Sequence, residues 1–557
     1  LLYDKNYNSL SDGINHNFNS TIDIRIDSTT EMTVIGALGL RNSNNISNAI
    51  DTTFNEARTL LNLNDQNKDN NSDGNNYSLS TNIRKKLKKR GRTITLDGAI
   101  GNNNSDNFYR ILSEVYGRDL KLNPNVSVFQ DQNQFSDNSN YSFGGNYTEP
   151  LSSNVFLVIN ASRRNNRTDL VKDFLDLTPD NLLLPGVLNN ELSRTFDNNF
   201  VYNTAGTNIR ISKDTYSASL GVDFQNSNLS GIPSIGEKID RQFNYFLPKA
   251  SFELDKLRIR ANYSTAIREP SMDQLQPVLD NSDPLNVYKG NPNLVPEYRH
   301  NMRLSYNFFD QFNFRSLFAN VRMGYTKNRI TTASIIDPVL FIRTQTPLNT
   351  DHESTMQANI NYSSPLNFMK AKYRVGLNSS LTNGINFING IENTIDRWTN
   401  GLNLQLENKS KTKYDASISS RWSFNNNIYK ENEALNTSFI NQTYEGYLAI
   451  FAGKGWIMDS RMEYNIYGQG SFDEATKVKL WQASVSKGFM DNKITAKLRV
   501  FDILNQNQGV SRSASETSIS ESVSNTIGRY FMVNVTYALN ALGAPKQSGP
   551  MHMIINR

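Results

Sequence analysis

The 557-residue sequence predicts an all-β protein, a large antiparallel β-barrel that crosses a membrane with its strands. Three observations predict this fold. Apolar and polar residues alternate over long stretches, as in strands that face lipid on one side and water on the other. The chain has 25 Tyr and 29 Phe, yet its mean hydropathy is only -0.55. Short turns alternate with long polar segments along the chain.

Composition argues against the other large fold classes. Hydrophobic residues total 37%, and aliphatic runs such as 155–159 are far shorter than the about 20 residues of a membrane-spanning helix. Disordered chains lack aromatic and β-branched residues, which are abundant here. The absence of cysteine fits an oxidising envelope compartment. A net charge of +5 gives no reason to expect a nucleic-acid partner.

The alternation is clear in residues 216–224, where the apolar side chains are Tyr216, Ala218, Leu220, Val222 and Phe224. The same period recurs in 257–264, 356–362, 402–407 and 531–539. Strands of soluble sandwiches average about five or six residues. Runs approaching about ten residues suit tilted strands that cross hydrocarbon, and their terminal Tyr and Phe suit interfacial girdles.

The connections are expected to be short on the periplasmic side and long on the extracellular side. Predicted short turns are 27–30, 88–92, 212–214, 255–256 and 491–493. Predicted long extracellular loops are 41–75, 101–138, 167–197, 227–243, 267–297 and 504–525.

A strand count predicts the size of the barrel. From a downward strand at 18–27 to a last downward strand at 529–540 there are about 21 strands, and single-chain bacterial barrels have even numbers. One upward strand, missing or partial before residue 18, would bring the count to about 22, a size whose lumen normally holds a plug. The expected domains are a barrel over 1–542 and a periplasmic C-terminal tail over 543–557.

Specific segments resemble a known family. Residues 290–298, read as Gly-Asn-Pro-Asn-Leu-Val-Pro-Glu-Tyr, resemble a segment of TonB-dependent receptors. Further matching segments are 268–271, 274–277, 280–285, 84–92, 147–151 and 501–507. Together they resemble the TonB-dependent receptor-like outer-membrane β-barrel family, over roughly residues 15–545. Members usually carry a carboxypeptidase-regulatory-like domain and a plug upstream of the barrel.

The resemblance implies a multi-pass barrel in the Gram-negative outer membrane, in contact with its lipids. Ligand uptake across that membrane is the function it favours. Neither a plug nor a TonB box is found in the sequence, so TonB is expected as a partner only if both precede Leu1. The alternative is a non-transporting scaffold or subunit of a larger outer-membrane complex, which would hold a surface lipoprotein or another subunit.

Catalysis has little support in the sequence. The four histidines, His16, His300, His352 and His552, are scattered and none has metal-ligand spacing. There is no Gly-x-Ser-x-Gly elbow and no thiol. We therefore expect no enzyme activity, no catalytic, cofactor-binding or metal-binding residues and no cofactor. Residues 65–73 faintly resemble a calcium loop, but a solvated loop is the simpler interpretation.

Two groups of charges fit the barrel without a special role. The basic run from Lys85 to Arg92 falls at a predicted periplasmic turn. One interpretation is an anchor to anionic lipid or to a periplasmic partner. The simpler one is an exposed turn that keeps its charges out of lipid. Predicted lumen-facing charges would contact a plug, line a substrate path or be hydrated. They are Arg258, Arg260, Arg322, Lys372, Arg374, Asp459, Arg461 and Glu463. The Asn-, Ser-, Asp- and Tyr-rich loops suit sugars, peptides or proteins equally well.

Overall fold

The computed structural model describes residues 2–538 except 181, 183, 234–237, 278, 473, 491–492 and 515–518. Strands make up 76% of the structure and helices 2%, which confirms the predicted all-β class. Among the residues described, no helix is long and apolar enough to cross a membrane. The predicted tail at 543–557 lies outside the described residues.

The long strands are β1 (Leu2–Arg25), β2 (Thr30–Phe54), β3 (Leu60–Lys86), β4 (Thr93–Tyr116), β5 (Val128–Pro150), β6 (Val155–Asp176), β8 (Arg194–Ser212), β9 (Tyr216–Pro233), β10 (Ile239–Leu254), β11 (Ile259–Arg268), β14 (Glu297–Asp310), β15 (Arg315–Ile336), β16 (Arg343–Leu366), β17 (Ala371–Ile388), β18 (Ile391–Asn408), β19 (Tyr414–Tyr429), β20 (Thr437–Phe451), β21 (Trp456–Tyr467), β22 (Thr476–Phe489), β23 (Ile494–Phe501) and β26 (Tyr530–Tyr537). The short elements are β7 (Val187–Leu188), α1 (Met272–Leu275), β12 (Leu279–Asp280), β13 (Asn286–Lys289), η1 (Asn367–Met369), η2 (Glu433–Leu435), β24 (Val510–Ala514) and β25 (Ile519–Val523).

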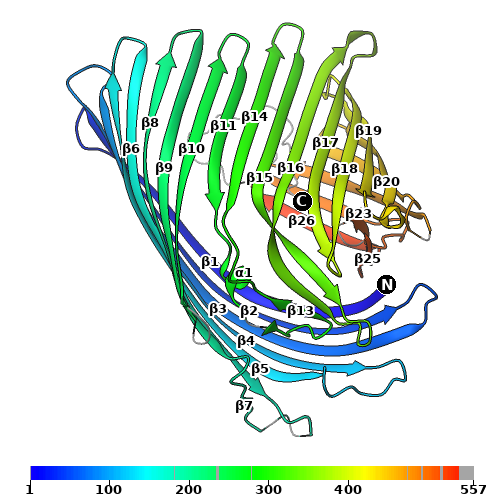
Figure 1. The fold of residues 1–557 in the computed structure, drawn as a ribbon. Helices are drawn as coiled ribbons and strands as arrows, with labels where there is room; N and C mark the ends of the chain where they lie inside the picture. Colours follow the sequence, from blue (N-terminus) through cyan, green and yellow to red (C-terminus); the bar gives the residue numbers. More distant parts are fainter. Residues whose placement is uncertain are drawn as a thin grey trace.

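One sheet of 24 strands forms the body of the protein, and β24 with β25 forms a second. Apart from the short β7, β12 and β13, each strand of the large sheet pairs antiparallel with the next long strand along the chain. The sheet curls, so that the strands after β19 turn away behind β15–β18 (Figure 1). This meander with short connections is the topology that the alternating sequence predicts.

The meander has 21 long strands in the described residues, in agreement with the count from the sequence. Since every neighbouring pair is antiparallel, β1 and β26 run in the same direction. In the part of the chain that the structure describes, β1 pairs only with β2 and β26 only with β23. The prediction of a partial upward strand before residue 18 is wrong for residues 2–17, because they extend β1 itself.

Most of the short turns lie at one end of the sheet, here called the turn end, as predicted, although the two-residue connection 389–390 between β17 and β18 lies at the opposite end. Those at the turn end connect the strands at 26–29, 87–92, 151–154, 213–215 and 255–258, and further along at 311–314 and 452–455. The opposite end, here called the loop end, carries the longer connections 177–193, 269–296 and 502–529.

Three of the predicted long loops are mostly strand, and the described residues of one of them, 227–243, belong largely to β9 and β10. Residues 41–75 belong largely to β2 and β3, joined by only 55–59, and 101–138 belong largely to β4 and β5. Polar side chains continue the ladder there by bonding across it, as Asn42 Nδ2 donates to Asp73 Oδ1 at 2.6 Å. The 27 residues of β3 reach roughly 90 Å, about three times the hydrocarbon thickness of a bilayer.

An apolar belt covers the outward face near the turn end. Paired residues in neighbouring strands point to the same side of a sheet, and the outward set includes Leu220, Phe246 and Val533. These side chains are 70%, 68% and 71% exposed. Apolar groups so exposed are stable against lipid rather than water. At the upper edge of the belt lies an aromatic girdle that includes Tyr141, Phe224, Trp398, Trp422, Tyr444 and Tyr464.

Candidate functional site in the lumen

The inward face of the sheet is polar along its length. Asn359 of β16, Asn378 of β17, Gly401 of β18 and Ser423 of β19 lie side by side in the ladder. They border a hollow of about 660 Å³ that spans β16 to β21. Its other polar lining residues are Gln357, Ser379, Ser380, Thr399, Asn403, Arg421, Asn441, Thr443, Glu463, Asn465 and Tyr467. The wall therefore offers mainly amides and hydroxyls.

Charges on this wall neutralise one another. Glu445 lies between two arginines, 3.8 Å from Arg421 Nη2 and 3.0 Å from Arg461 Nε. Asp459 Oδ1 accepts from Ser484 at 2.5 Å and from Lys497 at 3.0 Å. The wall is hydrophilic with little local excess of either sign.

The structure brings seven of the eight predicted lumen charges onto the inward face. Arg260 pairs with Glu253 at 2.5 Å, Arg374 donates to Gln405 at 3.0 Å and Lys372 lies 4.0 Å from Glu407. Arg322 donates to Asn320 at 3.2 Å, and Glu463 accepts from Asn465 at 2.8 Å. Asp459 and Arg461 belong to the pairs above. Arg258 lies in the 255–258 turn instead, where its φ is 52°.

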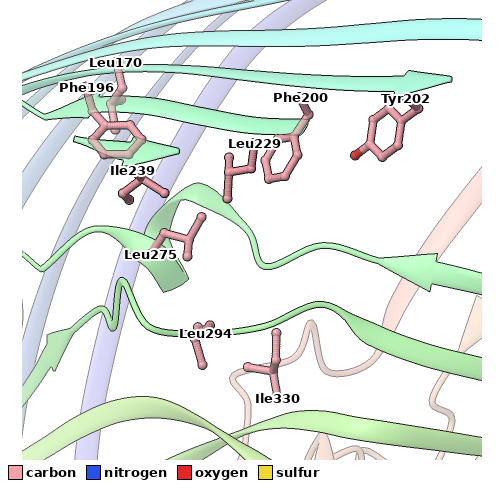
Figure 2. Close-up of a cluster of buried hydrophobic side chains, with 9 residues drawn as sticks. All are labelled: Leu170, Phe196, Phe200, Tyr202, Leu229, Ile239, Leu275, Leu294 and Ile330. Atoms are coloured by element: carbon pink, nitrogen blue, oxygen red, sulfur yellow. The ribbon is translucent and has the colours of Figure 1, made fainter. Parts of the chain in front are cut away.

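At the loop end, residues 269–296 fold against the inward face. Leu275 of α1 and Leu294 pack in a buried cluster with Leu229, Ile239 and Ile330 from three strands. Figure 2 shows Leu275 and Leu294 among the sheet residues, with Phe196, Phe200, Tyr202 and Leu170 on the neighbouring strands. This segment is tied to β3 as well, since Gln66 Nε2 donates to Ser282 O at 3.0 Å. It narrows the lumen at the mouth of the sheet.

Gly290 explains part of the 290–298 pattern. A Cβ at this position would lie 2.2 Å from Gln276 O and 2.6 Å from Asp273 O, so only glycine lets the segment pack on α1. The next residue, Asn291, donates from its backbone N to Gln274 O at 2.6 Å and from Nδ2 to Pro347 O at 3.1 Å.

Glu297, directly after the same segment, forms ion pairs with neighbouring arginines. Its side chain is 1% exposed, and its carboxylate accepts from Arg329 Nη1 at 2.8 Å and from Arg299 Nε at 2.9 Å. Its Oε1 also accepts the backbone N–H of Ile330 at 2.9 Å. Arg329 continues to Glu353 at 3.2 Å. The buried carboxylate is therefore fully paired, and it joins the end of the inward segment to β15.

A sheet with an apolar outward belt and a polar inward wall is the arrangement of a membrane barrel. Residues 85–537 match the model of the outer membrane protein beta-barrel family. The chain belongs to this family. It is a protein of the Gram-negative outer membrane. Barrels of this membrane have their short turns in the periplasm and their long loops outside the cell, which assigns the turn end to the periplasm.

Solved outer-membrane proteins match the chain at low identity. The siderophore receptor PirA from Pseudomonas aeruginosa is 13% identical, with 95% of this chain and 80% of that chain covered at a TM-score of 0.38. The copper transporter OprC is 11% identical, with 96% and 82% covered at 0.46. A Serratia marcescens hemophore receptor HasR, in complex with HasA and heme, is 11% identical, with 95% and 80% covered at 0.44. No curated protein matches the chain by sequence.

On the periplasmic face of this family member, the basic run is partly paired. Glu149 of the next hairpin accepts from Lys89 at 2.7 Å and from Arg92 Nε at 2.7 Å. The run therefore fastens two periplasmic turns to each other, a role that sequence reasoning missed because the partner lies 57 positions away.

The calcium-loop resemblance at 65–73 has no structural counterpart. These residues belong to β3, where Asp65, Asp69 and Asp73 are spread along an extended strand. Oxygen ligands cannot converge on one ion from an extended strand, because successive same-face residues lie about 7 Å apart. Within the described residues, no group of three or more His, Asp or Glu side chains could hold a metal ion.

Proposed function

We propose that this chain carries a ligand across the outer membrane through the lumen of its barrel, without catalysis. One observation supports this most directly: a polar wall with a hollow of about 660 Å³ lies behind an apolar, lipid-facing belt. A scaffold has no need for such a lumen, whereas a transport path needs hydrogen-bonding groups that replace the ligand's water. Coupling to TonB enters the proposal only together with an upstream plug and TonB box.

The wall suggests the chemistry of the ligand. Its amides and hydroxyls donate and accept hydrogen bonds, and its charges occur in opposite pairs such as Glu445 with Arg461. A large ligand with many hydroxyl or amide groups and little net charge is the best match, such as an oligosaccharide or a peptide.

The test is binding and uptake by the full-length protein in vesicles, with three probes: a neutral hexasaccharide, a neutral ten-residue peptide and a ferric hydroxamate. We expect one of the first two to bind. Asn403→Trp, on the inward wall, should weaken binding and uptake by about tenfold by filling the hollow. Leu404→Trp is the matched control, because Leu404 is the next residue and points outward, where it is 41% exposed.

Two results would overturn the proposal. One is equal uptake by both tryptophan variants, since the ligand would then bypass the wall. The other is a wild-type protein that binds no probe but purifies as a stable complex with another outer-membrane protein. The scaffold role would then explain the fold better.

A further inference from the structure

Two histidines that are far apart in the sequence, His300 and His352, come close together on the outward face, where each lies against Tyr325. Along β14 from the periplasmic turn, the outward residues are Leu304, Met302 and then His300. Along β16 the outward Met356 is followed by Ser354 and then His352. A third histidine, His16 of β1, lies beside the outward Leu40 of β2. On β14 and β16 the imidazole lies where the apolar belt ends on the extracellular side, whereas on β1 the outward Ile14 and Leu10 continue beyond His16.

Two of them belong to a continuous row of rings across four strands. We call Tyr263, Tyr298, His300, Tyr325 and His352 the tyrosine–histidine row. Ring centroids are 4.9 Å apart for Tyr298 and His300, 5.9 Å for His300 and Tyr325, and 5.5 Å for Tyr325 and His352. The Tyr263 hydroxyl lies 2.9 Å from His300 Nδ1. The row is therefore held in place by both ring contacts and hydrogen bonding.

A lysine stands in the same row without a protein partner. Lys327 of β15 is the ladder neighbour of Tyr298 on one side and of His352 on the other. It is exposed, and its ammonium has no ion pair or hydrogen bond to any described residue. An outward cation at the edge of hydrocarbon is stabilised by an anion at the lipid surface. A carboxylate oxygen of Asp351 lies 3.3 Å from His352 Nδ1.

In the periplasmic girdle, by contrast, a lysine contacts an aromatic ring of the protein. Lys213, at a periplasmic turn, lies over the ring of Tyr216 with its Nζ 5.5 Å from the centroid. An ordinary girdle of tyrosine and lysine is satisfied by contacts of that kind. The tyrosine–histidine row instead leaves Lys327 free beside two imidazoles. It therefore offers up to three N–H donors directed outward at the height of the outer-leaflet headgroups.

We propose that the tyrosine–histidine row and Lys327 bind the phosphorylated sugar headgroup of an outer-leaflet glycolipid. Lys327 and the imidazoles of His300 and His352 donate to the phosphate oxygens. The tyrosine rings pack on the apolar face of the sugar, and the acyl chains lie along Met302 and Met323 below. This site lies on the outside of the barrel and does not depend on the ligand path through the lumen.

The experiment uses the full-length protein in detergent, with purified diphosphorylated lipid A as the probe and native mass spectrometry as the readout. The double variant Lys327→Glu with His352→Ala should bind about tenfold less lipid A than the wild type. Lys213→Glu, in the periplasmic girdle, is the matched control and should bind as the wild type does. Heat-dependent mobility on denaturing gels verifies that each variant is folded.

Two comparisons make the outcome decisive. Dephosphorylated lipid A should bind the wild type weakly, and phosphatidylglycerol, an anion without a sugar, should not replace lipid A. Equal lipid A binding by the double variant and the wild type would overturn the proposal. Equal binding of phosphatidylglycerol would do the same, because the row would then be a general anionic girdle.

Discussion

The carboxylate of Glu297 and the guanidinium of Arg329 are joined by a 2.8 Å hydrogen bond at a point where Glu297 is only 1% exposed. Glu297 is the first residue of β14 and Arg329 lies on β15, so the pair connects the inward segment 269–296 to the wall. A buried carboxylate is stable only when its charge is matched, and here Arg299 contributes the second partner.

Replacement of Glu297 should release the inward segment. Glu297→Ala leaves two arginines without their buried partner, which costs about 3 kcal/mol in stability. We expect protease cleavage within 269–296 to become much faster while the barrel strands stay intact. Glu253→Ala is the control, since Glu253 pairs with the exposed Arg260 near a periplasmic turn and such pairs contribute at most about 1 kcal/mol. Unchanged cleavage in Glu297→Ala would refute this role.

Gly290→Ala should disturb the same segment by a steric route. The new methyl group would meet the backbone oxygens of Gln276 and Asp273, so α1 must shift and Leu275 must leave its buried position. We expect a loss of about 2 kcal/mol, the scale of an overpacked core. The guanidinium midpoint in vesicles measures it. Gly446→Ala is the control, because nothing lies within 4 Å of a Cβ there, and a similar drop in both variants would count against the steric account.

Arg512 should hold the extracellular hairpin of β24 and β25 on the sheet. Its side chain is 2% exposed and donates to Gly468 O at 2.6 Å, Glu474 O at 2.5 Å and Glu521 Oε2 at 2.5 Å. Arg512→Lys keeps the charge but loses the planar fork. We expect both Arg512→Lys and Arg512→Ala to raise the rate of protease cleavage in 502–529 by about tenfold. If Arg512→Lys is cleaved as slowly as the wild type, charge alone is sufficient.

The first periplasmic turn should be pH-dependent. Hydrogen bonds from Thr29, together with those from Thr30, lower the pKa of Asp27 to about 2. Since the folded-state pKa is depressed, the stabilisation is fully present above the ordinary pKa near 4 and is lost as the pH falls through about 2. Asp27→Asn should therefore lower the denaturation midpoint at pH 6 and have little effect at pH 2. A difference that persists at pH 2 would contradict this assignment.

Much of the fold follows from the sequence alone. Period-two alternation determines which residue of each strand faces lipid, because a shift of one position would bury polar groups in hydrocarbon. The turns at 26–29 and 255–258, the all-β class and the count of 21 long strands follow from that rule and from local turn chemistry. The prediction of a loop at 41–75 is wrong, because polarity on both faces is equally compatible with a strand that continues beyond the membrane into water.

Only the tertiary structure determines the contacts between residues that are distant in the sequence. The inward wall, the pairing of Glu297 with Arg329 and the bond between Glu149 and Arg92 depend on the register of the ladder and the curl of the sheet. The histidines are scattered in the sequence, and their spacing along the chain carries no information on their height, that is, their position along the membrane normal. Height is set by strand tilt and by each strand's distance from its turn, so His300 and His352 become neighbours only when the sheet is assembled.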